Sequence, residues 1–142
     1  MSLYKINNRK VTEEEFESSK EDGNYQIFYE DGTLRSERSY YQDKRHGVER
    51  YYRKDSTLEY EASYHQDQLH GVERWYNKDG TLRSETPCCQ GQVHGVVKRY
   101  YEDGTLEYET IYVYGVKRSD LKDNKLARLV LFQEYVPWEE SV

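Results

Sequence analysis

The stretch HGVERYYRKDSTLEYEASYHQDQL, residues 46–69, is followed directly by HGVERWYNKDGTLRSETPCCQGQV, residues 70–93, and the two segments share one design. The tetrapeptide DGTL begins at residues 31, 79 and 103, and its variant DSTL begins at residue 55. The tripeptide HGV begins at residues 46, 70 and 94, so every interval between equivalent markers is 24 residues. Self-similarity at a fixed period is typical of repeat proteins, and we expect four copies of one structural unit.

Each copy contains two turn signals, Asp-Gly and His-Gly, which separate segments of six or seven residues rich in Tyr, Val and Thr. This pattern predicts a β-hairpin followed by a tight link to the next hairpin. The expected fold class is therefore all-β: an elongated antiparallel β-meander solenoid of 24-residue hairpins. Strands lie about 4.8 Å apart, so equivalent residues should recur every ~10 Å.

The size of the Asp-Gly loop follows from side-chain alternation. A two-residue loop would place the columns of Val48 and Tyr52 on the face opposite to those of Leu58 and Tyr64. A three-residue loop that ends at Ser56 places these four columns on one face. We therefore expect a type I turn whose third residue is left-handed, a conformation that favours Gly.

This register predicts the two faces of the sheet. Large aromatic and charged residues lead one face, which contains Tyr51, Arg53, Glu59, Trp75, Arg83 and Glu107. The opposite, packed face repeats columns of Val, Tyr and Leu: Val48, Tyr52, Leu58, Tyr60 and Tyr64; Val72, Tyr76 and Leu82; Val96, Tyr100, Leu106, Tyr108 and Tyr112.

The chain is expected to divide into an N-terminal cap (1–22), four hairpin repeats (23–118) and a C-terminal cap (119–142). Thr12, with Glu15 three residues later, is a capping-box pattern that predicts a short helix in the first cap. The segment KLARLVLFQEYV, residues 125–136, breaks the period and is apolar. It is expected to form a final strand or short helix that shields the last sheet edge.

Composition limits the classes of partner. The net charge of −6 argues against nucleic acid and makes membrane association unfavourable, because nucleic acids and anionic lipids both bind positive patches. No run of residues approaches the length of a membrane span, and the N-terminus lacks a secretory signal pattern. We therefore expect a cytoplasmic protein with a protein partner.

The histidines form a repeated column at His46, His70 and His94. As metal ligands they would lie ~10 Å apart and parallel, whereas zinc needs convergent ligands at about 2 Å. Hydrogen bonding in the turns is the simpler role, so we expect no metal site. The fourth histidine, His65, lies outside the column and is expected to be solvated.

The remaining candidates for chemistry also have structural explanations. Cys88 and Cys89 are adjacent, and a bridge between neighbours is strained, so we expect two reduced, structural thiols. A column of glutamates beside a column of basic residues is better explained as a cross-strand charge ladder than as paired catalytic carboxylates. We therefore expect no catalytic residue, no cofactor and no enzymatic activity. The two columns are Glu37, Glu61, Glu85 and Glu109, and Arg50, Arg74 and Lys98.

The order of these markers resembles the bacterial variant of the MORN repeat, whose pattern runs Y-x-x-G-x-x-H-G, then YY-x-D/N-G, then L-x-x-E-x-x-Y. Here YYQDKRHG begins at Tyr40 and is followed by the pair Tyr51–Tyr52, by DSTL and by Glu61. Aspartate replaces the Gly of Y-x-x-G at positions 43 and 67. The resemblance recurs in four copies and covers about two thirds of the chain.

The resemblance also carries expectations about function. Small bacterial proteins made of this variant include the YwqK-type antitoxins, so it implies a protein that binds and neutralises a toxin. The leading hypothesis is a non-enzymatic protein-binding module of the antitoxin or immunity type that occludes a basic toxin. The alternative is a membrane- or lipid-associated MORN scaffold, against which the acidic balance argues.

One pattern indicates where a partner binds. The segment after each Asp-Gly turn reads LRSE, LEYE, LRSE and LEYE, so one position alternates between Arg and Glu with a period of 48 residues. Charge balance along a solvated face would explain the alternation; a binding strip with two aromatic anchors is the functional alternative. The predicted partner-binding residues are Tyr51, Arg53, Glu59, Trp75, Arg83 and Glu107.

Overall fold

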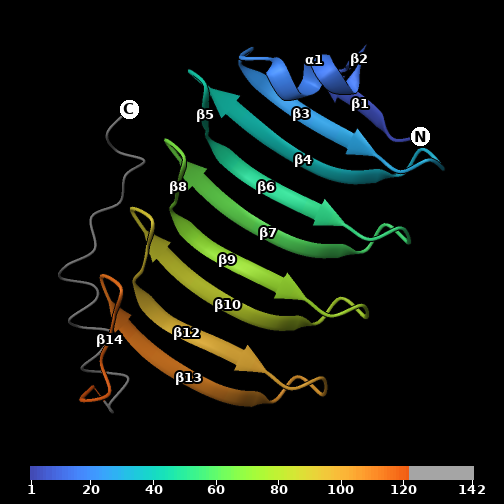
Figure 1. Cartoon of the computed structure of the whole chain (residues 1–142). Coiled ribbons are helices and arrows are strands. Elements are labelled where there is room, and N and C mark those ends of the chain that lie inside the picture. Colours follow the sequence, from blue (N-terminus) through green and yellow to red (C-terminus); the bar gives the residue numbers. More distant parts are fainter. Residues whose placement is uncertain (122–142) are drawn as a thin grey trace.

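The computed structural model describes residues 1–121, which form one antiparallel β-sheet of 14 strands and one short helix (Figure 1). Hairpins follow one another along the sheet, and the predicted all-β meander is confirmed. The elements are β1 (Leu3–Ile6), β2 (Arg9–Val11), α1 (Glu13–Ser18), β3 (Gly23–Phe28), β4 (Leu34–Tyr41), β5 (Lys44–Arg45), β6 (Gly47–Tyr52), β7 (Leu58–His65), β8 (Gln68–Leu69), β9 (Gly71–Tyr76), β10 (Leu82–Cys89), β11 (Gln92–Val93), β12 (Gly95–Tyr100), β13 (Leu106–Val113) and β14 (Val116–Lys117).

The Asp-Gly turns have the predicted three-residue loop. In the second copy the Arg53 N–H donates to the Thr57 carbonyl at 2.9 Å, and the Ser56 N–H donates to the Arg53 carbonyl at 2.9 Å. Ser56 is left-handed, with a φ of 69°. The Asp55 carboxylate accepts the N–H and O–H of Thr57, and these hydrogen bonds lower the pKa of Asp55.

The strand after each turn contains one extra residue. Tyr52 pairs with Leu58, but Tyr51 pairs with Tyr60, so Glu59 is left over as a β-bulge. The bulge recurs in every copy, at Arg35, Glu59, Arg83 and Glu107. The alternating Arg/Glu position of the sequence is therefore the bulge position.

The bulge corrects the predicted faces, because an extra residue reverses the alternation of every side chain beyond it. Tyr51 and Trp75 share a face with Tyr60, and we call it the Tyr60 face. Val48 and Tyr52 lie on the opposite face, here called the Glu61 face. The predicted packed face was therefore wrong: its Val, Tyr and Leu columns (Val48, Tyr52, Leu58) lie on the Glu61 face, and its later columns (Tyr60, Tyr64) lie on the Tyr60 face.

The predicted tight link between hairpins contains a second turn, which lies a few residues before the His-Gly pair that was expected to form it. Tyr41 pairs with Lys44, and the two residues between them, Gln42 and Asp43, have φ values of 51° and 64°. Positive φ at both central residues is the type I′ geometry of two-residue hairpins. The short strand β5 then leads through His46 into β6. Asp-Gly turns therefore lie at one end of the long strands and tight turns at the other (Figure 1).

The tight turns also connect successive repeats. The Asp67 N–H donates to the Arg45 carbonyl at 3.1 Å, and the Arg45 N–H donates to Asp67 Oδ1 at 2.7 Å. The N–H groups of Gly91 and Gly115 make the corresponding bonds to Leu69 and Val93 at 2.9 and 2.7 Å. Each turn is thus held by the preceding repeat.

The N-terminal cap contains the predicted helix. The Glu15 N–H donates to Thr12 Oγ1 at 3.1 Å, and the Thr12 N–H donates to Glu15 Oε2 at 3.2 Å, which confirms the capping box. Phe16 of α1 is buried in a cluster with Ile6 and Tyr25. The hairpin β1–β2 was not predicted; β1 pairs with β3 and extends the sheet. The segment expected to form the C-terminal cap, residues 125–136, lies outside the described residues.

No helix within residues 1–121 has the length and apolarity needed to cross a membrane.

Candidate binding surface

Three aromatic rings lie in one cross-strand row at the centre of the Tyr60 face. Tyr51 pairs with Tyr60 and Tyr60 pairs with Trp75. The Tyr51 and Tyr60 rings stack with centroids 5.2 Å apart, and the Tyr60 and Trp75 rings are 4.5 Å apart. Tyr60 is buried between its neighbours, whereas Trp75 is 38% exposed. The row therefore ends in a large aromatic side chain that solvent reaches.

Carboxylates hold the phenols of this row. The Tyr51 hydroxyl donates to Glu49 Oε1 at 2.7 Å, and the Tyr60 hydroxyl donates to Glu73 Oε2 at 3.1 Å. Glu49 is fully buried and also contacts Arg45 at 3.4 Å. Burial, followed by the hydrogen bond to Glu49, raises the pKa of Tyr51 to about 12. Both phenols therefore act as fixed hydrogen-bond donors rather than as acids at neutral pH.

Beyond Trp75 the next residue in the row has a small side chain. Trp75 pairs with Ser84, Ser84 with Arg99, and Arg99 with Tyr108. Because Ser84 is short, a hollow of about 300 Å³ opens at this point. It is lined by Trp75, Arg83, Ser84 and Arg99. An indole and two guanidinium groups thus border one open hollow, which we call the Ser84 hollow.

The predicted binding residues divide between this hollow and the turns. Trp75 and Arg83 line the hollow, and Glu107 reaches its rim through an ion pair with Arg99 at 3.4 Å. Tyr51 lies on the same face, beyond Tyr60 in the row. Arg53 and Glu59 do not line the hollow; they pair with each other at 3.4 Å in the preceding repeat.

Arg53 has a structural role between repeats. Its guanidinium donates to the carbonyls of Leu58 at 3.2 Å and Tyr76 at 2.6 Å, and it pairs with Glu59 at 3.4 Å. In the first copy the Tyr29 hydroxyl makes the equivalent bond, donating to the Tyr52 carbonyl at 2.6 Å. In these two copies the side chain that precedes the turn therefore reaches across to the next hairpin.

Sequence reasoning missed Ser84 and Arg99. The signal was present, since the position after the bulge alternates Ser36, Tyr60, Ser84 and Tyr108 along the chain. Because the bulge was not predicted, however, this column was assigned to the face opposite to Tyr51 and Trp75. The aromatic row, and with it the gap at Ser84, could therefore not be recognised.

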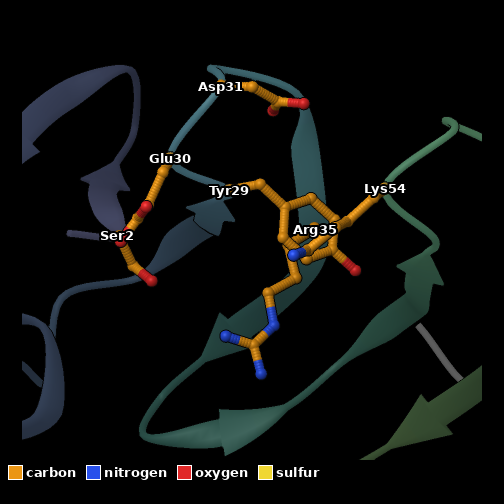
Figure 2. A pocket seen from close by; sticks show the side chains of 6 residues that line it. All are labelled: Ser2, Tyr29, Glu30, Asp31, Arg35 and Lys54. Carbon is orange, nitrogen blue, oxygen red and sulfur yellow. The ribbon is translucent and has the colours of Figure 1, made fainter.

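The equivalent bulge residue of the first copy, Arg35, lies in a different environment (Figure 2). Its guanidinium carbon is 5.8 Å from the centroid of the Tyr29 ring, and Lys54 lines the same pocket. Glu30 and Asp31 also line this pocket, and Glu30 binds the N-terminal amine at 2.6 Å. This pocket thus combines two basic side chains with two carboxylates, whereas the lining of the Ser84 hollow contains no carboxylate.

The sequence profile of the MORN repeat variant matches residues 21–43, 69–87 and 93–114, which contain the hairpin strands β3 and β4, β9 and β10, and β12 and β13. These three segments are therefore similar to MORN repeats. Such repeats are generally protein- or membrane-binding modules. A search of curated proteins found no match. A solved structure titled "Crystal Structure of TarM" is similar with a TM-score of 0.44 and 14% identity, over 82% of this chain and 22% of that chain. This chain thus spans about a fifth of that chain's length.

The Glu61 face of the sheet carries the predicted charge ladder. Arg50 contacts Glu37 at 3.5 Å and Glu61 at 3.4 Å, and Arg74 contacts Glu61 at 3.7 Å and Glu85 at 3.5 Å. Cross-strand pairing continues the ladder from Glu85 to Lys98 and then to Glu109. Glu37, Glu61 and Glu85 are therefore engaged in sheet pairing, as predicted.

The histidines of the MORN pattern bind the tight turn of the following repeat. The Gln90 N–H donates to His70 Nδ1 at 3.3 Å, and the Tyr114 N–H donates to His94 Nδ1 at 3.0 Å. These bonds confirm the expected role in the turns and place the proton of the neutral ring on Nε2. His65, which was expected to be solvated, is instead half-buried, with ring centroids 5.3 Å from His46 and 6.4 Å from His70.

The two thiols are poor nucleophiles. Cys88 and Cys89 are free and buried. Burial, with a smaller contribution from Glu73, raises the pKa of Cys88 to about 11, and burial raises the pKa of Cys89 as well. Because the thiolate is the reactive form, raised values favour a structural role.

Proposed function

We propose that this chain is a non-enzymatic protein-binding module. The observation that carries the proposal is the exposed Trp75 beside two arginines on the Tyr60 face. Within residues 1–121 the sheet is a single layer, and α1 packs at its β1 end, away from Trp75. Trp, Tyr and Arg are the residue types that dominate protein interfaces, so this surface suits a protein partner.

The finer proposal is an antitoxin or immunity-type protein of the bacterial cytoplasm that occludes a basic toxin. The net charge of −6 supports a basic partner, because complementary charge accelerates encounter. Exposed Glu13, Glu14 and Glu17 of α1 add to this field. The buried free thiols fit a reducing compartment.

Capture followed by titration tests the proposal. The immobilised chain would be used to isolate proteins from a lysate of its source organism, and the captured protein would be titrated by calorimetry. Trp75→Ala should weaken binding by about 2 kcal/mol or more, roughly 30-fold, because aromatic anchors dominate interfaces. Glu13→Lys in the cap is the control and should bind almost normally. If the control loses binding while Trp75→Ala binds normally, the docking surface lies at the N-terminal cap and not at Trp75.

Growth and flotation assays test the finer proposal and its alternative. Expression of the captured protein should arrest growth, and co-expression of this chain should restore it. Liposomes of phosphatidylcholine and phosphatidylserine should leave the chain at the bottom of a flotation gradient. Salt-sensitive co-flotation would favour the membrane-associated scaffold instead.

A further inference from the structure

Ser84 interrupts a cross-strand row of larger side chains, as Ser36 does in the first copy. The Tyr51 and Tyr60 rings stack, and the Trp75 ring is tilted by 57° against Tyr60. In the neighbouring repeats Tyr60 and Tyr108 occupy the position that Ser84 occupies here. The Ser84 side chain cannot cover the indole as Tyr60 does on its other side. The hollow therefore has the position of a missing aromatic ring, with Trp75 as one wall.

The charge of the hollow differs from that of the repeats that carry Tyr. Where Tyr is present, the bulge residue is Glu and has an arginine partner: Glu59 pairs with Arg53 at 3.4 Å, and Glu107 pairs with Arg99 at 3.4 Å. At Ser84 the bulge residue is Arg83, which is exposed and forms no ion pair with any residue of 1–121. The gap thus combines a missing ring with an arginine that forms no ion pair within residues 1–121.

We propose that the Ser84 hollow binds an aromatic side chain of the protein partner that is flanked by an acidic residue. The ring stacks on Trp75 in the place of the missing Tyr, and the adjacent carboxylate pairs with Arg83. Indole and guanidinium groups both bind aromatic faces, and arginine forms strong bidentate bonds with carboxylates. The inference rests on the proposed function, since it names the segment of the partner that this surface recognises.

The arrangement at Arg35 shows why the two arginine-bearing repeats differ. There the guanidinium already lies against the Tyr29 ring, and Glu30 and Asp31 supply negative charge in the same pocket. At Ser36 the residue that corresponds to Trp75 is Ile27, so a bound ring would find no indole there. Arg35 and Ser36 therefore provide a matched control for Arg83 and Ser84.

A peptide titration followed by NMR tests the inference. The probe is acetyl-Gly-Glu-Phe-Glu-Gly-amide, added to ¹⁵N-labelled full-length chain while the indole N–H signal of Trp75 is observed. Trp75→Phe assigns this signal against that of Trp138. A saturable shift is expected. Peptides with Lys in place of both Glu, or with Ala in place of Phe, should bind at least tenfold more weakly.

Exchanging two residues between repeats tests the site without endangering the fold. Arg83→Glu with Ser84→Tyr converts LRSE into the LEYE of residues 58–61, a sequence that this hairpin already accommodates elsewhere. The double variant should lose peptide binding by at least tenfold, whereas Arg35→Glu with Ser36→Tyr should bind normally.

Two outcomes would overturn the inference: absence of a saturable shift with the acidic aromatic peptide, or equal binding by wild type and the Arg83/Ser84 variant. The captured partner separates this failure from failure of the proposed function. If Trp75→Ala weakens binding of that partner but the Arg83/Ser84 exchange does not, the protein-binding function stands and the hollow is not its anchor site.

Discussion

Single residues determine whether each turn is relaxed or strained. The third loop residue is Gly in the first, third and fourth copies, with φ values of 88° to 90°, and Ser56 in the second, with a φ of 69°. This difference could be predicted from the sequence, because loop length and left-handed geometry follow from the repeat. A left-handed non-glycine residue costs about 1–2 kcal/mol, so Ser56 occupies a strained position.

Reciprocal substitutions at this position should have opposite effects. Ser56→Gly should raise the free energy of unfolding by about 1 kcal/mol, and Gly80→Ser should lower it by about the same amount. A Cβ at Gly80 would meet no atom within 4 Å, so backbone strain is the only effect expected there. Urea unfolding followed by circular dichroism measures both. Changes of the same sign would contradict the strain argument.

The hydroxyl of Tyr51 should stabilise the fold through buried Glu49. Tyr51→Phe leaves this carboxylate without its 2.7 Å donor and should cost about 2 kcal/mol at pH 7. Because the pKa of Tyr51 is raised to about 12 in the folded state, against about 10 for a free Tyr, its contribution is complete below pH 10 and is lost as the pH rises toward 12.

The stability difference between wild type and Tyr51→Phe should therefore shrink between pH 10 and pH 12. Tyr101→Phe, at a position that is 53% exposed, is the control and should change stability by less than about 0.5 kcal/mol. Unfolding curves at several pH values would show the trend, and a difference that stays constant to pH 12 would contradict it.

Elements are where sequence reasoning both succeeded and failed. The hairpins, the Asp-Gly turns and the charge ladder could be predicted because their signals are local. The bulge could not, since it recurs at the same place in every copy and leaves the 24-residue period unchanged. Missing it reversed the face of every residue between Tyr60 and Tyr64, and with it the aromatic row that borders the Ser84 hollow.

The charge ladder should contribute as a unit that depends on alternating sign. Arg74→Glu would place three glutamates in succession across the strands and should cost about 1–2 kcal/mol in low salt. The loss should diminish in 1 M NaCl, where charges are screened within about 3 Å. Arg83→Glu makes the same change in charge outside the ladder and should cost less than about 0.5 kcal/mol. Equal losses of stability in the two variants would mean that the stability depends on net charge and not on cross-strand pairing.

At the scale of the molecule, each repeat contacts mainly its neighbours. Backbone pairing joins successive hairpins, and the histidine and tight-turn bonds also connect one repeat to the next. Such architectures behave as one-dimensional arrays whose stability is a sum of repeat and interface contributions. The period alone therefore predicts that whole repeats can be removed.

Deletion of residues 83–106 should give a shorter folded sheet, because it joins Leu82 to Glu107 at equivalent positions of successive hairpins. Trp75 would then face Tyr108, and Arg74 would face Glu109, so the aromatic row and the charge ladder both continue. Deletion of residues 83–94 removes half a repeat and joins strands that run in opposite directions. Circular dichroism and amide exchange should show a cooperative β-sheet for the first variant, with reduced stability, and an unfolded chain for the second. If both variants fold equally well, the 24-residue unit does not set the register of the sheet.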